Sequence, residues 1–241
     1  EKTGLGATKI LEEGKLPKAE AIIIGEPTDC QLGVVQKGCI WLELTVYGKT
    51  SHGAYPEEGV NAIQSGYEVA NRLKNYIETF SHPILGKSTA QVTRIEGGVA
   101  PNMTPDICTL LMDIRIVPSV NVQMIIHMLE CFYQDYKEYT KHNITFAHKI
   151  LTDRMPIEIA SDHEYVQKFQ ETLRRRGLPA KEIGINYFTD ASIFVKEKPN
   201  IPILLFGPGE PNVAHKPNEY VTLDKYFQSI DALIRVFGGI E

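Results

Sequence analysis

The chain has 241 residues, of which 43% are hydrophobic and 23% are charged, a composition typical of a globular protein and not of a disordered or fibrous one. Its 25 Lys and Arg residues against 30 Asp and Glu residues give a formal net charge of −5, so we do not expect nucleic acid as a partner. The sequence has no run of 18 apolar residues, and residues 1–4 lack the apolar core of a signal peptide, so neither a membrane span nor secretion is predicted.

The four cysteines, Cys30, Cys39, Cys108 and Cys131, are scattered along the chain and form no C-x-x-C pair. This spacing predicts reduced thiols, most of them buried. Reduced thiols indicate a reducing compartment, and we therefore expect a cytoplasmic protein.

The chain opens with apolar residues at helical spacing between Leu5 and Leu11, and this pattern ends before Gly14. Residues 19–24 are rich in isoleucine and predict a strand that runs directly into Gly25-Glu26-Pro27-Thr28. Glu26 is therefore expected at the end of a sheet. A glutamate in a turn is usually a solvated acid, and the position beside a buried strand makes a ligand role the alternative.

Residues 39–151 show a self-contained pattern. Strands are predicted for residues 40–47, 90–96, 108–117 and 144–150, and amphipathic helices for residues 61–78 and 122–136. The resulting order is β-α-β-β-α-β, the ferredoxin-like arrangement. We expect its two helices to cover one face of an antiparallel sheet.

Two loops of this middle segment carry polar side chains between small residues. Gly48–Pro56 contains His52, and Gly97–Pro105 contains Asn102. Each loop taken alone is more typical of a turn than of a site. The predicted fold would bring His52 and Asn102 near each other.

After residue 151 the pattern returns to α/β character, with a helix at 162–176, a strand at 201–206 and a last helix that follows Thr222. Residues 1–38 and 152–241 are thus predicted to be the two parts of one α/β domain, and residues 39–151 a domain inserted between them.

The loop after the strand at 201–206 is the second candidate site. Gly207 and Gly209 lie where a backbone can approach a ligand, and His215 follows between two prolines. A lone loop histidine is usually solvated. Together with strand-end carboxylates, and without a nucleophile elbow or a P-loop, it points instead to a metal site of nitrogen and oxygen ligands, as in metal-dependent hydrolases.

Five segments occur in an order that resembles the M20 metallopeptidase family, which includes acetylornithine deacetylase, succinyl-diaminopimelate desuccinylase, aminoacylase and glutamate carboxypeptidase. They are Gly25-Glu26-Pro27-Thr28, Gly48–Pro56 with Gly59–Ala62, Gly97–Asn102, Asp113-Ile114-Arg115 and the loop around His215. The resemblance implies a catalytic α/β domain interrupted by a ferredoxin-like lid and dimerisation domain. It also implies a two-zinc centre, with cobalt or manganese as alternative metals, that hydrolyses an amide bond.

The resemblance also implies roles for single residues. Glu26 would ligate one metal ion and His215 the other. His52 would reach the site of the partner subunit in a homodimer and stabilise the tetrahedral oxyanion. Asn102 and Arg115 would hold the carboxylate or acyl group of the substrate, with Arg115 as a two-pronged donor. Gly207 and Gly209 would line the substrate loop.

The sequence departs from the family pattern at its start. Relatives of this type carry a metal-binding histidine, a bridging aspartate and a pair of glutamates, of which only the second has an expected equivalent here, Glu1. A register shifted by one residue would place Lys2 there, and lysine cannot ligate zinc in that way. We therefore expect a C-terminal portion of the enzyme, which as given binds zinc weakly and hydrolyses nothing measurable.

For the parent protein, the resemblance favours removal of an acyl group from an N-acyl amino acid or diamino acid, as in deacetylases and desuccinylases. A dipeptidase, tripeptidase or carboxypeptidase of the same family is the first alternative. A non-catalytic binding or assembly module that keeps the fold is the second.

Overall fold

The computed structural model describes residues 4–238. The chain divides into two compact units, of which one comprises residues up to Lys37 together with those from Met155 onward, and the other comprises Gly38–Arg154. Across the described residues, no helix has both the length and the apolar character needed to cross a membrane.

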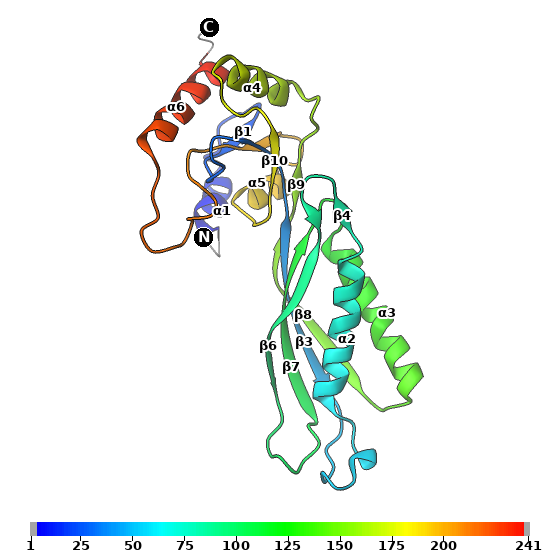
Figure 1. Cartoon of the computed structure of the whole chain (residues 1–241). Helices are drawn as coiled ribbons and strands as arrows, with labels where there is room; N and C mark the ends of the chain where they lie inside the picture. Colours follow the sequence, from blue (N-terminus) through cyan, green and yellow to red (C-terminus); the bar gives the residue numbers. More distant parts are fainter. Residues whose placement is uncertain (1–3, 239–241) are drawn as a thin grey trace. The chain divides into compact units, whose positions relative to one another are not determined.

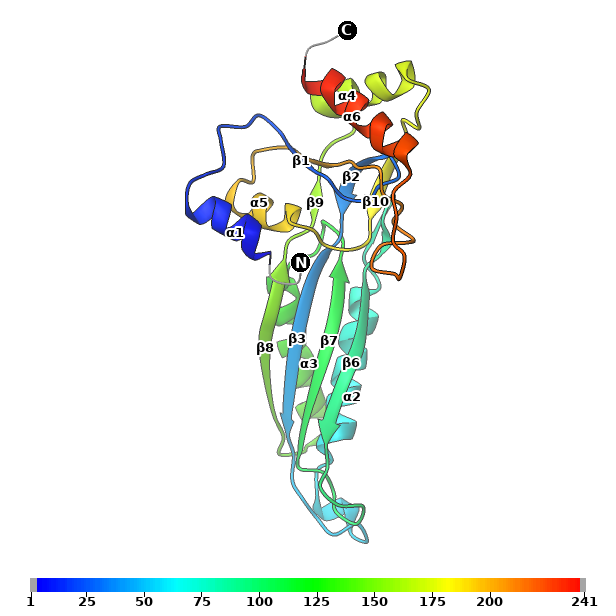
Figure 2. The ribbon, with the colours of Figure 1, turned by 90° about the vertical axis from the view of Figure 1, so that its left-hand side faces the viewer.

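The middle unit is a four-stranded antiparallel sheet with two helices on one face (Figures 1 and 2). The sheet order is β6-β7-β3-β8. The strands are β3 (Gly38–Tyr47), β6 (Thr89–Gly97), β7 (Ile107–Ile116) and β8 (Thr145–Arg154), and the helices are α2 (Ala62–Ile77) and α3 (Val122–Thr140). The predicted β-α-β-β-α-β order is confirmed.

The alternation of side chains along β7 explains why only one face is covered. Cys108, Leu110, Met112 and Ile114 are fully buried, whereas the residues between them lie on the opposite face of the strand. Gly66 lets α2 approach this apolar face closely, because it has no side chain: a Cβ atom at this position would lie 2.6 Å from Leu110 Cδ1.

Both helices of the middle unit begin at an asparagine cap. The Asn61 side chain accepts a hydrogen bond from the Gln64 N–H at 3.1 Å, and the Asn121 side chain accepts one from the Met124 N–H at 2.9 Å. These caps satisfy backbone donors that a helix start otherwise leaves unpaired. Three short elements complete the unit: η1 (Pro56–Glu58) and the paired strands β4 (Ser81–His82) and β5 (Gly86–Lys87).

The other unit contains a mixed five-stranded sheet. Its order is β1-β11-β2-β10, with β9 paired to β2. β1 runs parallel to β11 and β10 runs parallel to β2, whereas β11 and β9 are antiparallel to β2. The strands are β1 (Ile22–Ile24), β2 (Leu32–Gln36), β9 (Ile157–Glu158), β10 (Glu182–Ile185) and β11 (Ile203–Leu205).

Four helices belong to this unit: α1 (Leu5–Glu12), α4 (Glu164–Arg175), α5 (Ala191–Glu197) and α6 (Leu223–Phe237). Its core cluster combines residues of the sheet with Ala7 of α1 and Ala191 of α5. α4 packs its Phe169 ring against Phe206, with ring centroids 4.7 Å apart. Arg176, after α4, pairs with Asp231 of α6 at 3.0 Å.

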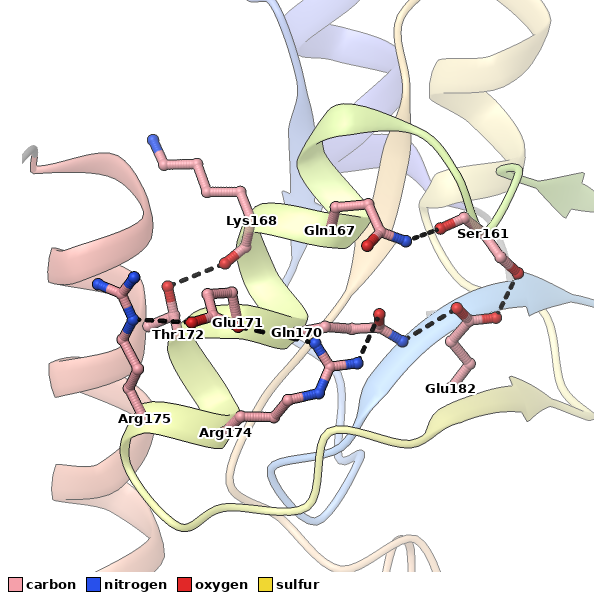
Figure 3. Close-up of polar contacts among 9 residues, drawn as sticks. All are labelled: Ser161, Gln167, Lys168, Gln170, Glu171, Thr172, Arg174, Arg175 and Glu182. Carbon is pink, nitrogen blue, oxygen red and sulfur yellow. Dashed lines mark hydrogen bonds and ion pairs between the residues drawn. The ribbon is translucent and has the colours of Figure 1, made fainter.

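A polar network fixes α4 to the sheet, as Figure 3 shows. Glu182 on β10 accepts hydrogen bonds from Ser161 Oγ at 2.6 Å and from Gln170 Nε2 at 3.0 Å. The Gln170 side chain is mostly buried, and its oxygen accepts a hydrogen bond from Arg174 at 3.2 Å. Both ends of this buried amide are therefore satisfied, which fixes the position of the helix along β10.

The structure differs from the sequence-based prediction in its short strands. The segment predicted as a strand at 19–24 is extended only from Ile22 to Ile24, and β2, β9 and β10 were not predicted. β2 was missed because all five of its residues are buried, so it lacks the alternation that marks a half-exposed strand.

We predict that Leu110→Ala destabilises the middle unit by about 2–5 kcal/mol, because it leaves a cavity beneath α2. Leu111→Ala is the matched control on the opposite face, with an expected loss of about 1 kcal/mol or less. Urea unfolding followed by the fluorescence of Trp41, the single tryptophan of the chain, measures both. Equal losses in the two variants would contradict the assigned core face.

Candidate functional site

The candidate site in the α/β unit lies where β1 and β11 end. These strands run parallel with Ile24 opposite Leu205. The turn after β1 and the loop after β11 therefore leave the sheet at the same place, the carboxyl ends of the two strands. In α/β sheets, ligands bind at the carboxyl ends of parallel strands. The turn carries Glu26 and the loop leads to His215.

Thr28 joins the turn to the loop. Its buried hydroxyl donates a hydrogen bond to Gly207 O at 3.2 Å and accepts one from the Gly207 N–H at 3.0 Å. The Cys30 N–H donates to the same carbonyl at 2.9 Å, and the Asp29 N–H donates to Gly209 O at 2.7 Å. Hydrogen bonds therefore hold the backbone of residues 28–30 against that of residues 207–209.

The two glycines of the loop are required by this contact. A Cβ atom at Gly207 would lie 2.4 Å from Glu26 O, and one at Gly209 would lie 2.8 Å from Pro27 Cβ. The close approach predicted for these glycines is thus made to the neighbouring turn of the same chain. Their role in binding substrate stays a prediction.

Glu26 is partly buried and lies near Tyr187, a residue that the sequence reasoning did not single out. Tyr187 Oη donates to Pro27 O at 3.4 Å. Burial, and then the negative charge of Glu26, raises the pKa of Tyr187 to about 12. The phenol therefore stays protonated at neutral pH and remains a hydrogen-bond donor beside the turn.

His215 lies further along the loop and is exposed. Its backbone has a positive φ of 61°, and its N–H donates to Glu219 Oε2 at 3.0 Å. A non-glycine residue with positive φ is uncommon, and here the carboxylate of Glu219 holds the backbone in this conformation.

Lys225 connects the same region to α6. Its Nζ pairs with Asp29 and lies 2.7 Å from Glu210 Oε1, and its backbone carbonyl accepts a hydrogen bond from Cys30 Sγ at 3.4 Å. The hydrogen bonds to Asp29 and Glu210 raise the pKa of Lys225. No spacing in the sequence signals this cluster, because its members come from three separate segments.

The donor chemistry of Glu26 and His215 suits zinc, which accepts carboxylate oxygen and imidazole nitrogen. A zinc centre needs at least three protein ligands. Within residues 4–238, no group of three or more His, Cys, Asp or Glu side chains is placed to hold a metal ion. These residues alone therefore do not make a complete zinc site, and Glu1, the third predicted ligand, lies outside the described residues.

In the middle unit, the structure places the His52 and Asn102 loops side by side. The Gly53 N–H donates to Asn102 O at 2.7 Å, and His52 forms an isolated β-bridge with Met103. The His52 side chain accepts a hydrogen bond from the Ala54 N–H at its Nδ1 atom, at 3.1 Å. His52 lies at an exposed position.

Arg115 lies at the other end of the same sheet. At about 3.4 Å per residue, β7 separates it by roughly 27 Å from Ile107, where the Asn102 loop ends. Its guanidinium makes two bonds to Asp113, at 2.6 and 2.9 Å, and Asp113 also accepts a hydrogen bond from Trp41. Within one chain, Asn102 and Arg115 are therefore not brought together.

The fold therefore defines a class of protein in which an α/β unit is interrupted by a ferredoxin-like unit. Residues 34–139 match the family model described as "Peptidase dimerisation domain". The chain is 29% identical over 233 residues to acetylornithine deacetylase of Buchnera aphidicola subsp. Acyrthosiphon pisum (strain Tuc7), a match that covers 94% of this chain. It is 27% identical over 271 residues to a probable succinyl-diaminopimelate desuccinylase of Staphylococcus aureus (strain N315), with 96% of this chain covered.

Among solved structures, a tripeptidase from Staphylococcus aureus has the same fold, with a TM-score of 0.77 at 21% identity, over 98% of this chain and 61% of that one. The predicted resemblance to the M20 metallopeptidase family is thus confirmed by the family model matched at residues 34–139 and by the curated relatives. The chain spans 58% and 63% of the length of the two curated relatives.

We predict that Gly207→Ala disrupts the piece of backbone formed by residues 28–30 and 207–209, because the added Cβ atom would overlap Glu26 O. A loss of about 1–3 kcal/mol in the free energy of unfolding is expected. Gly25→Ala is the control, since a Cβ atom there meets nothing within 4 Å. Thermal unfolding compares the two, and a Gly207→Ala protein as stable as Gly25→Ala would show that the contact is wrongly placed.

Proposed function

We propose that this chain belongs to a zinc-dependent amide hydrolase that removes an acyl group from an N-acyl amino acid or diamino acid. The observation that carries the proposal is the joining of the Glu26 turn to the His215 loop at one edge of the sheet. The names of the curated relatives, a deacetylase and a probable desuccinylase, support the reaction class.

In this proposal Glu26 ligates one zinc ion and His215 the other, and the remaining donors come from outside the described residues. The contribution of residues 28–30 and 207–209 is positional. The hydrogen bonds of Thr28 to Gly207 hold the turn and the loop in register, so the two ligand-bearing segments keep a fixed separation when substrate binds.

The middle unit supplies the polar groups that would contact substrate. His52 and Asn102 lie on paired, exposed loops. Since Arg115 is at the far end of the sheet, a second copy of the chain is needed to bring these groups to one substrate. We therefore propose a homodimer through this unit, which its match to a peptidase dimerisation domain supports.

A tripeptidase or another peptidase of the same family is the second candidate. It is favoured by the high structural similarity to the Staphylococcus aureus tripeptidase. The two candidates differ in the group on the acyl side of the scissile amide bond, which is a small acid in one and an amino acid residue in the other.

We also propose a cytoplasmic location. The four cysteines form no disulfide, and Cys30, Cys39 and Cys108 are buried. Burial raises the pKa of the Cys39 thiol to about 11. Such protonated, enclosed thiols suit a reducing compartment.

We predict that Glu26→Gln and His215→Ala each lower bound zinc and reduce hydrolysis at least about 100-fold, assayed in the longest polypeptide that the gene encodes. The substrates are N-acetylornithine, N-succinyl-diaminopimelate and a tripeptide, and metal content is measured by atomic absorption. The 241-residue chain alone serves as control, with weak zinc binding and no turnover expected. Two tight zinc sites in that chain, or unchanged activity in both variants, would overturn the proposal.

We predict that His52→Ala lowers kcat by about 100–1,000-fold, as the loss of one oxyanion donor does, with a much smaller change in KM. Mixed dimers test whether this histidine acts across the subunit interface. A subunit with His52→Ala combined with one carrying His215→Ala should regain activity, because one complete site forms. Dimers that stay inactive would exclude a role in trans.

A further inference from the structure

A cavity of about 580 Å³ lies between helix α3 and the edge strand β8 of the middle unit. Figure 2 shows this helix behind β8 and β3. Side chains between His127 and Asp135 line the cavity from α3, and Phe146 and His148 line it from β8. Cavities of this size hold small molecules. None of these residues takes part in the zinc or substrate site proposed above.

Two stacked aromatic rings form part of the lining. Tyr133 of α3 lies parallel to Phe146 of β8, with ring centroids 4.5 Å apart. The Tyr133 ring also lies 6.3 Å from the imidazole ring of His148. The tyrosine side chain thus extends from the helix toward the strand, among the residues that line the cavity. An aromatic face attracts an organic cation placed within about 6 Å of the ring.

The Tyr133 hydroxyl is a buried group without a protein partner. Tyr133 is 6% exposed, and its oxygen makes no hydrogen bond to any of residues 4–238. Tyr136, three residues further along α3, instead donates to Ser65 Oγ at 3.0 Å. Buried polar groups in native proteins are nearly always hydrogen-bonded, so a hydroxyl left alone in the wall of a cavity indicates a ligand as its partner.

This hydroxyl can serve as both donor and acceptor. Burial, and then the negative charge of Glu130, raises the pKa of Tyr133. The phenol therefore stays protonated at neutral pH, and its oxygen keeps lone pairs that accept a hydrogen bond from a ligand.

The charge of the lining selects a cation. Glu130 and Asp135 are exposed carboxylates of the lining, which contains no lysine or arginine. Neither carboxylate forms an ion pair within the described part of the chain. An anionic ligand would be repelled by both, whereas an ammonium group would gain charge-assisted hydrogen bonds.

A metal ion is a poorer occupant than an organic cation. His127, Cys131 and His148 carry donor atoms that metals accept, but no group of three or more His, Cys, Asp or Glu side chains in residues 4–238 is placed to hold an ion. The His127 imidazole lies 3.9 Å from Cys131 Sγ on the same helix. An ammonium group has no such demand for a fixed set of ligands, and carboxylates, a phenol oxygen and aromatic rings suit it.

We propose that the cavity between α3 and β8 binds a small aliphatic amine in its ammonium form. The ammonium group donates a hydrogen bond to the Tyr133 oxygen and pairs with Glu130 or Asp135, and the aliphatic part lies against the Phe146 ring. The site is separate from the residues of the proposed function and stands whether or not that function is correct.

Cys131 serves as a native attachment point for the test, because it is partly exposed and lines the cavity, whereas Cys30, Cys39 and Cys108 are buried. Three disulfides with the same two-carbon spacer are used as probes. Cystamine carries ammonium groups, bis(2-hydroxyethyl) disulfide carries hydroxyls, and 3,3′-dithiodipropionate carries carboxylates. The Cys131 thiolate attacks one sulfur of the probe, forms a mixed disulfide and releases the other half as a thiolate.

The probes are equilibrated with the longest polypeptide that the gene encodes, at a fixed ratio of disulfide to thiol. Mass spectrometry of the Cys131 peptide gives each equilibrium constant, and the same exchange in urea corrects for intrinsic differences among the probes. We expect the folded protein to favour cystamine over the hydroxyl probe by at least about 10-fold, and to disfavour the carboxylate probe.

The variants separate the lining from the rest of the helix. Glu130→Gln combined with Asp135→Asn should reduce the preference for cystamine to about 2-fold or less. Glu138→Gln removes a carboxylate of α3 that does not line the cavity, and it should leave the preference unchanged. Tyr133→Phe keeps the ring and should lower the preference about 3-fold without lowering Tm, because the lost hydroxyl has no protein partner.

A measurement without covalent attachment completes the test. 1,4-Diaminobutane should slow the alkylation of Cys131 by iodoacetamide, and 1,4-butanediol should not. Equal alkylation rates with the two compounds would overturn the proposal. So would a Cys131 that reacts with none of the three disulfides, one without a preference for cystamine, or a preference that either the double variant or Tyr133→Phe retains in full.

Discussion

The hydrogen bonds between Thr28 and Gly207 are the constraint on which the candidate site depends. The parallel pairing of β1 with β11 brings the two strand ends to one edge, but each connection could leave that edge in several directions. The buried hydroxyl of Thr28 contacts both the N–H and the carbonyl of Gly207, and only glycine fits there, because a Cβ atom would lie 2.4 Å from Glu26 O. The path of the chain toward His215 is set there, and the pairing of Lys225 with Asp29 fixes the helix that follows.

The regular elements of the middle unit follow from local rules and could be predicted from sequence. Alternation along β7 and the apolar face of α2 are strong signals, and α2 and α3 begin within one residue of the predicted helix starts. The short strands of the α/β unit could not be predicted in the same way. Fully buried β2 has no alternation, and β9 is only two residues long. Their structure is set by partners that lie more than a hundred residues away in sequence.

The candidate site likewise has residues that sequence motifs point to and contacts that only the fold reveals. Motifs singled out Glu26, His52, Asn102 and His215 as candidates, and the fold does pair the His52 and Asn102 loops. Sequence could not show that Tyr187 lies by the Glu26 turn, or that Lys225 joins Asp29 to Glu210, because these contacts exist only in three dimensions. The separation of Arg115 from Asn102, by contrast, follows from the predicted strand at 108–117, because the loop with Asn102 precedes that strand and Arg115 lies near its end.

The register of the middle sheet has a consequence for how such a protein arises and can be altered. β3 begins at Gly38 and β8 ends at Arg154, and Cys39 is paired directly with Arg154. The first and last residues of the middle unit are thus neighbours on adjacent strands, a few ångströms apart. A module whose two ends meet in this way can be gained, lost or exchanged as one block without stretching its host. Evolution, or an engineer, could replace residues 38–154 as one block while keeping the α/β unit.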